Sequence, residues 1–217
     1  MKKIIAIIIS VIFILSLSIP SFAIEPTGEQ ISELKEYGII TGDPDGNMRF
    51  GDTLTRSEAV KIICTLLCFN ENSNIVGIES PFPDVSEYHW AKGYISIAKE
   101  LKIVEGDPSG NFNPEASVTN EEFIKMLVVA LGYEPIAESR GGYPVGYNMV
   151  ASNCGITEGL QFEVNTPALR GEVAIMTVKA LDVPLMKQVG FGTNAEYAVM
   201  DGKNGMALET LRDNFEK

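Results

Sequence analysis

The chain has 217 residues, with 29 acidic against 17 basic side chains and a formal net charge of −12. Such an acidic surface disfavours nucleic acids and anionic membrane surfaces as partners. The length suits one compact domain or several small repeats, with enough chain to bury a core.

The N-terminal segment predicts a cleaved signal peptide, residues 1–23. Two lysines precede an apolar run over 4–17, and the small residues Ser21 and Ala23 occupy the −3 and −1 places of a cleavage site. An uncleaved anchor is the alternative, but the run is shorter than the roughly 20 residues that span a bilayer. We therefore expect a secreted chain of 194 residues and net charge −14, without membrane contact after cleavage.

An internal repeat organises the rest of the chain. The stretch "GDPDGNMRFGDTLTRSE" (42–58) recurs without a gap as "GDPSGNFNPEASVTNEE" (106–122), and an apolar helical stripe follows each copy. A weaker copy, "GITEGLQFEVNTPALRGE" (155–172), has a turn three residues shorter and places Arg170 opposite Arg56. One helix pair cannot bury its apolar face alone, so the copies should pack together.

Each unit reads as helix, Gly-rich turn, extended piece and second helix, which predicts a mainly α fold of three helix-turn-helix repeats. We expect repeats at 24–70, 82–133 and 143–183, joined by loops at 70–81 and 134–142. The tail, 184–217, contains "EYAVMDGKNGMALETL", which reads as a hairpin around its "DGKNG" turn or as the start of a missing domain.

The three cysteines are an odd number and do not suggest a disulfide framework. Cys64 and Cys68 have helical i, i+4 spacing, which rarely suits a disulfide, and the repeat alignment places apolar residues opposite Cys64 and Cys154. We expect buried thiols.

Alternating oxygen side chains at Asp43, Asp45 and Asn47 resemble a calcium loop. Counting from Asp43, however, the required Gly and Glu positions are Met48 and Leu54. The aspartates are explained as turn formers, and we expect no metal and no cofactor.

The second helix of each repeat begins with a recognisable capping pattern. Thr55 with Glu58, and Thr119 with Glu122, fit a capping box. Arg56 lies in the first helical turn, where a cation opposes the helix dipole. It is either a surface ion-pair residue, or it converges with free helix N–H groups on an anion.

These residues resemble the S-layer homology family over residues 26–183. The resemblance rests on "GIITGDPDGNMRF" (38–50), "LTRSE" (54–58), "FPDV" (82–85) and "HWA" (89–91). It implies a pseudo-threefold helical bundle that binds secondary cell-wall polysaccharide, commonly through an acidic, pyruvylated sugar, in grooves between repeats. The family's ligand-binding arginine falls on Arg56 and Arg170, whereas the second repeat has Asn120. The third repeat has also lost the capping threonine, at Leu169.

Three further residues are candidates for the same grooves. Trp90, the only tryptophan, either stacks on a sugar or belongs to the core, and Tyr143 holds its place in the third repeat. Asp84 either accepts sugar hydroxyls or caps the helix that begins near Ser86. The family's arrangement implies that the first groove pairs Arg56 with Asp84 and Trp90.

The resulting prediction is a non-catalytic, secreted anchor at the bacterial cell wall or S-layer. Its partner would be wall polysaccharide, with assembly alongside other S-layer or surface proteins. His89 is the only histidine and has no recognisable nucleophile motif around it. The alternatives are an envelope-associated glycan hydrolase, since carboxylate pairs across a fold are invisible in sequence, and a truncated S-layer structural protein.

Overall fold

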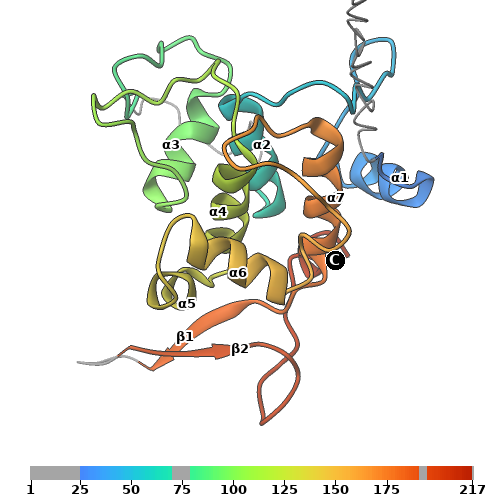
Figure 1. Cartoon of the computed structure of the whole chain (residues 1–217), viewed down its shortest axis with the longest axis vertical. Coiled ribbons are helices and arrows are strands. Elements are labelled where there is room, and N and C mark those ends of the chain that lie inside the picture. Colours follow the sequence, from blue (N-terminus) through green and yellow to red (C-terminus); the bar gives the residue numbers. More distant parts are fainter. Residues whose placement is uncertain (1–24, 70–78, 191–194, 217) are drawn as a thin grey trace, which may run out of the picture.

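The computed structural model describes residues 25–69, 79–190 and 195–216, and this part of the chain is mainly α-helical, as predicted (Figure 1). The predicted signal peptide and most of the first predicted loop lie outside the described residues. No helix in the described ranges is long and apolar enough to cross a membrane. The elements are α1 Gly28–Glu36, α2 Arg56–Leu66, α3 Lys92–Glu100, α4 Asn120–Ala130, α5 Glu134–Ser139, α6 Val145–Asn153, α7 Arg170–Leu181, β1 Met186–Gly190 and β2 Glu196–Val199, followed by a 3₁₀ turn, Arg212–Asn214.

The predicted capping boxes begin α2 and α4. The Thr55 hydroxyl accepts from the Glu58 N–H and the Glu58 carboxylate accepts from the Thr55 N–H; Thr119 and Glu122 repeat both bonds. In α7 the predicted loss of the threonine cap is confirmed, because Leu169 has no side-chain acceptor. Glu172 nevertheless accepts from the Leu169 N–H at 3.0 Å, so half of the box remains.

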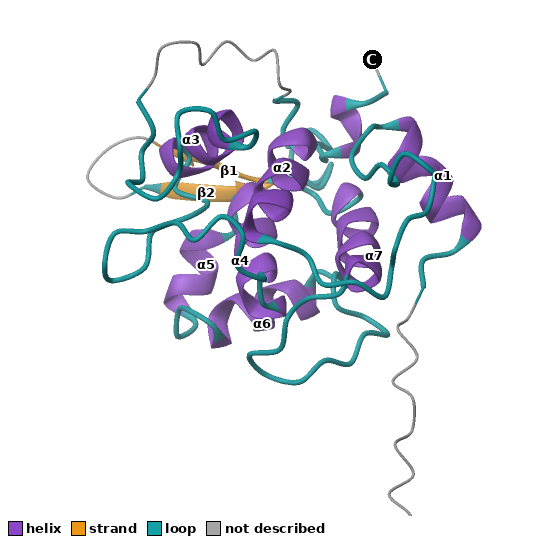
Figure 2. Ribbon diagram, turned by 90° about the horizontal axis from the view of Figure 1, so that it is seen from above, coloured by secondary structure: helices purple, strands orange, loops and turns teal. Residues whose placement is uncertain are grey.

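The helices pack in a cyclic order (Figure 2). The first helix of each repeat lies on the second helix of the repeat before it: α3 packs on α2, α6 on α4, and α1 closes the ring on α7. No helix pair within one repeat forms the main contact. Each unit therefore depends on its neighbours for its core, as expected of repeats that cannot bury an apolar face alone.

Three extended pieces meet at the centre of the ring, one before each of α2, α4 and α7. The Leu54 N–H donates to the Ala168 carbonyl at 3.0 Å, Val118 donates to Leu54 at 2.9 Å, and Ala168 donates to Val118 at 2.9 Å. All three side chains are buried. This closed triangle of backbone hydrogen bonds marks a pseudo-threefold axis and shows that the weaker third copy is a structural equivalent of the other two.

The cysteine prediction is correct for Cys64 and wrong for Cys68. The Cys64 thiol is fully buried and contacts the Tyr94 carbonyl, and burial raises its pKa to about 12. Cys154 is half-buried. Cys68 is exposed because α2 ends at Leu66, and Cys68 lies beyond the helix in the left-handed conformation, with φ of 63°.

The segment 134–142, predicted to be a loop, contains the short helix α5. Pro135 lies in its first turn, where a missing N–H costs nothing, and α5 packs against α6. The contact is close because Gly146 of α6 lies directly on the Ala137 carbonyl. A segment that was predicted to be a loop therefore contains a helix, with its proline in the first turn.

The predicted tail hairpin is partly wrong. β2 is a strand, but it pairs antiparallel with the upstream β1, and the "DGKNG" turn is closed only by one bridge between Asp201 and Leu208. β1 is fixed beside α4 because the Met186 N–H donates to the Leu131 carbonyl at 2.9 Å, which offers β2 an edge.

The tail also connects the first and third repeats. Arg212 forms ion pairs with Glu33 of α1 and with Asp182 at the end of α7. Phe215 stacks on Tyr37, with ring centroids 4.6 Å apart. The tail therefore packs on the bundle and supports the junction at which the ring closes.

Candidate ligand-binding grooves

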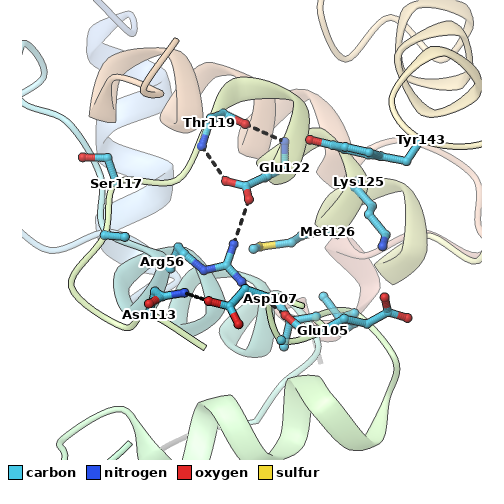
Figure 3. A pocket seen from close by; sticks show the side chains of 14 residues that line it. Arg56, Glu105, Asp107, Asn113, Ser117, Thr119, Glu122, Lys125, Met126 and Tyr143 are labelled. Atoms are coloured by element: carbon cyan, nitrogen blue, oxygen red, sulfur yellow. Dashed lines mark hydrogen bonds and ion pairs between the residues drawn. The ribbon is translucent and has the colours of Figure 1, made fainter. Parts of the chain in front are cut away.

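Arg56 reaches from the first repeat onto the second (Figure 3). Its Nε donates to the Phe112 carbonyl at 2.8 Å, its Nη1 donates to Glu122 Oε1 at 3.0 Å, and the guanidinium lies 4.7 Å from the centre of the Phe112 ring. Nη2 makes only a long contact, 3.4 Å, with the Glu105 carbonyl. Nε and Nη1 are therefore held by short hydrogen bonds, and the Nη2 edge of the guanidinium faces the groove. The Arg56 side chain is 13% exposed.

Arg170 repeats this arrangement between the third repeat and the first. Its Nε donates to the Met48 carbonyl at 3.1 Å and its Nη1 to Glu58 Oε1 at 2.9 Å. Met48 and Glu58 align with Phe112 and Glu122 in the sequence repeat. The two arginines are therefore equivalent residues in equivalent surroundings, as the alignment predicted.

The capping glutamates have a second role that the sequence reasoning missed. In Glu122, Oε2 accepts from the Thr119 N–H at 2.9 Å while Oε1 holds Arg56 of the neighbouring repeat. Glu58 divides its oxygens in the same way between the Thr55 N–H and Arg170. One carboxylate thus begins a helix and also orients the guanidinium that crosses the junction.

Of the two alternatives for Arg56, convergence with free helix N–H groups on an anion is wrong. The Arg56 and Ser57 N–H groups donate to the carbonyls of Ala116 and Pro114, at 2.9 and 3.1 Å. The first two N–H groups of α7 donate likewise, to carbonyls of the first repeat. Inter-repeat hydrogen bonds use these donors, so the positive charge of each groove comes from side chains such as the guanidinium and not from free helix N–H groups.

The Arg56 groove is a hollow of about 650 Å³ lined by all three repeats. Tyr143 of the third repeat, 46% exposed, lies across it with its ring 5.8 Å from Lys125 Nζ (Figure 3). Burial, followed by the nearby Glu122 carboxylate, raises the pKa of Tyr143. The lining residues are Arg56, Ile103, Val104, Glu105, Gly106, Asp107, Asn113, Ala116, Ser117, Thr119, Glu122, Lys125, Met126 and Tyr143.

The Arg170 groove consists of two hollows of about 180 and 440 Å³ that share four lining residues: Thr41, Glu58, Trp90 and Arg170. Trp90 of the second repeat is 55% exposed and takes the place that Tyr143 has in the Arg56 groove. Further lining residues are Ile39, Ile40, Gly42, Asp43, Asn47, Arg49, Thr53, Thr55, Lys61, Ile62 and Glu115.

The predicted partners of Arg56 are therefore wrong. The structure places Tyr143 beside Arg56 and Trp90 beside Arg170, because each groove takes its arginine and its aromatic residue from the two repeats on either side. Asp84 lines neither groove. It accepts the N–H groups of Phe112 and Asn113, at 2.8 and 2.6 Å, so it holds the turn instead of capping a helix.

A lysine in each groove was also missed. Lys61 and Lys125 occupy the same repeat position and line the Arg170 and Arg56 grooves respectively. The sequence repeat contained this information, because the aligned stretches "RSEAVK" and "NEEFIK" both end in a lysine. Each groove thus contains an arginine, a lysine and an exposed aromatic ring.

The third junction has a different composition. Asn120 is only 1% exposed and donates to Glu172 at 3.2 Å in place of an arginine. By the same alignment Ile175 replaces the lysine and Pro26 replaces the aromatic residue. The described structure therefore has two cationic grooves and one junction that lacks all three groups.

The Asp43 turn has the expected geometry. Asp43 Oδ1 accepts from the N–H groups of Asp45 and Asn47, at 3.0 and 2.8 Å, and the Asn47 bond in particular lowers the pKa of Asp43. Within the described ranges, no three His, Cys, Asp or Glu side chains lie close enough to hold a metal ion.

Comparison with known proteins gives the same family. The S-layer homology domain model matches residues 24–60 and 81–124. The chain is 30% identical to a middle cell wall protein of Brevibacillus brevis over 78% of its own length, and 35% identical to a cellulosome-anchoring protein of Acetivibrio thermocellus over 45%. It is 31% identical to an uncharacterized cell wall amidase of Bacillus anthracis over 42% of its length.

The chain spans only 16%, 20% and 16% of these three relatives, in that order. The family model does not extend over the third repeat, whose equivalence comes from the hydrogen-bond triangle and from Arg170. With its matched segments, its repeats and its relatives among cell-surface proteins, the chain belongs to the S-layer homology family.

Proposed function

We propose that this chain is a non-catalytic anchoring module that binds an acidic cell-wall polysaccharide non-covalently through the Arg56 and Arg170 grooves. The observation that carries the proposal is the duplicated groove itself. Two sites, built from different pairs of repeats, each combine an arginine, a lysine and an exposed aromatic side chain.

This combination suits a sugar that carries a carboxylate, such as a pyruvylated residue. In each groove the arginine is oriented by a carbonyl and a glutamate, so a ligand carboxylate can approach the remaining edge of the fork without reordering the side chain. The lysine adds a second charge, and the aromatic face packs against sugar C–H groups. The grooves are open hollows, which suits one unit of a longer chain.

The carboxylates of the grooves support binding more than catalysis. Glu58 and Glu122 each hold a backbone N–H and an arginine, so neither is placed as a general acid or a nucleophile. We therefore place the chain at the cell wall or S-layer as a secreted anchor, with wall polysaccharide and neighbouring surface proteins as its partners. The competing function, which the experiment must distinguish from anchoring, is that of an envelope-associated hydrolase.

The test is co-sedimentation of the purified chain with bacterial wall sacculi, before and after extraction of their polysaccharide. We expect binding that depends on the polysaccharide, is reduced by Arg56→Ala or Arg170→Ala, and is lost in the double variant. Arg140→Ala removes an exposed arginine that lines neither groove and should bind like wild type. Wild-type sedimentation by a folded double variant would overturn the proposal, and turnover of the glycan would favour the hydrolase.

A further inference from the structure

The Arg170 groove has one feature without a counterpart in the Arg56 groove. Glu115 lines it, and His89 Nε2 lies 3.0 Å from Glu115 Oε1. In the third repeat the aligned positions are Asn165 and Gly142, and neither lines the Arg56 groove. Beyond the shared arginine and lysine, the two grooves differ in their charged residues: Arg49 and Glu115 line only the Arg170 groove, and Glu105, aligned with Thr41, lines only the Arg56 groove.

His89 fixes this carboxylate in place. The Ala91 N–H, which can only donate, lies 3.1 Å from His89 Nδ1, so Nδ1 accepts and the neutral ring carries its proton on Nε2. That proton is donated to Glu115. The ring also stacks on Trp90, with centroids 5.8 Å apart. Although the Glu115 side chain is 73% exposed, it is thus tethered beside the aromatic platform of the groove.

The other charges of the Arg170 groove are engaged differently. Glu58 is paired with Arg170, Arg49 is paired with Asp52, and Asp43 accepts the N–H groups of its own turn. Glu115 contacts a histidine instead of one of the groove's cations. An anionic sugar between Trp90 and Arg170 would meet this carboxylate, and like charges in one site oppose binding.

We propose that Glu115, positioned by His89, is a specificity-determining residue that weakens the Arg170 groove for carboxylate-bearing sugars. The Arg170 groove then favours sugar units that present hydroxyl donors to Glu115. This inference rests on the proposed function, since the Arg170 groove must first bind the polysaccharide.

Trp90 makes the experiment selective, because the only tryptophan lines the Arg170 groove. Its fluorescence is titrated with polysaccharide extracted from bacterial walls, and again with the same material after amidation of its carboxylates. Glu115→Gln should lower the midpoint for the acidic form several-fold and leave the midpoint for the amidated form unchanged. Glu115→Asp, which keeps the charge, should titrate like wild type.

An unchanged or higher midpoint in Glu115→Gln, or the same shift for both polysaccharides, would overturn the inference. The Arg56 groove supplies the control: in an Arg170→Ala background, Glu115→Gln should not change sedimentation with sacculi. Failure of the proposed function has a different signature, since the Arg56→Ala, Arg170→Ala variant would then sediment like wild type. Glu115 would in that case have no ligand to select.

Discussion

Glu122 should contribute to stability in two separable ways. In Glu122→Ala the Thr119 N–H loses a charged acceptor at 2.9 Å and Arg56 loses its carboxylate. The cap and the partly buried ion pair together amount to about 2–3 kcal/mol. For a chain of this size that corresponds to a fall in Tm of roughly 5–10 °C. Glu122→Gln keeps an acceptor for the cap and should cost only about 1 kcal/mol.

The assay is thermal and urea unfolding followed by circular dichroism. A double-mutant cycle of Glu122→Gln with Arg56→Met isolates the inter-repeat pair and should give a coupling of about 0.5–1 kcal/mol. Glu105→Ala, which removes an exposed carboxylate from the same groove, is the control and should change the free energy of unfolding by less than about 0.5 kcal/mol. A Glu122→Ala variant as stable as this control, or a coupling of zero, would refute the reasoning.

Four other predictions concern the scaffold. Cys68→Gly should raise the free energy of unfolding by about 1 kcal/mol because Cys68 has a positive φ. Gly132→Ala should lower the free energy of unfolding, since the added Cβ would lie 2.0 Å from the Met186 carbonyl oxygen of the tail. Arg212→Ala should lower the free energy of unfolding in urea by about 1–2 kcal/mol, because it removes the ion pairs that join the first repeat to the third. An unchanged free energy of unfolding would mean that the tail does not support the ring. Hydrogen bonds, mainly from the Asn47 N–H and the Asn113 side chain, lower the pKa values of Asp43 and Asp107. Their contribution to stability is thus complete above about pH 4 and is lost as the pH falls through the folded pKa values. Between pH 5 and 3, Tm should fall more steeply in wild type than in the Asp43→Asn, Asp107→Asn variant, and parallel curves would contradict this.

Local features were predictable because their causes are local. The capping boxes at Thr55 and Thr119 and the Asp43 turn each follow from residues a few positions apart. The prediction of three repeats came from the apolar stripe, which recurs with the turn. The helix at 134–139 was missed because its proline is equally compatible with a loop and with a first helical turn.

The partners of each arginine were not predictable from the same information. Which repeat supplies the aromatic residue depends on the order in which the units close the ring, and no local pattern encodes that order. The second role of Glu122 was hidden for the same reason, since the spacing of a capping box accounts for only one of its two oxygens. Asp84 was misassigned because the N–H group of Phe112 that donates to it lies in a turn 28 residues downstream.

The stoichiometry of ligand binding tests the central claim most directly. Calorimetric titration with short fragments of wall polysaccharide should give two sites per wild-type chain, one in Arg56→Ala, one in Arg170→Ala and none in the double variant. The Asn120 junction should contribute no site, because it lacks the arginine, the lysine and the aromatic residue. Three sites in wild type, or two sites that survive the double substitution, would contradict the account.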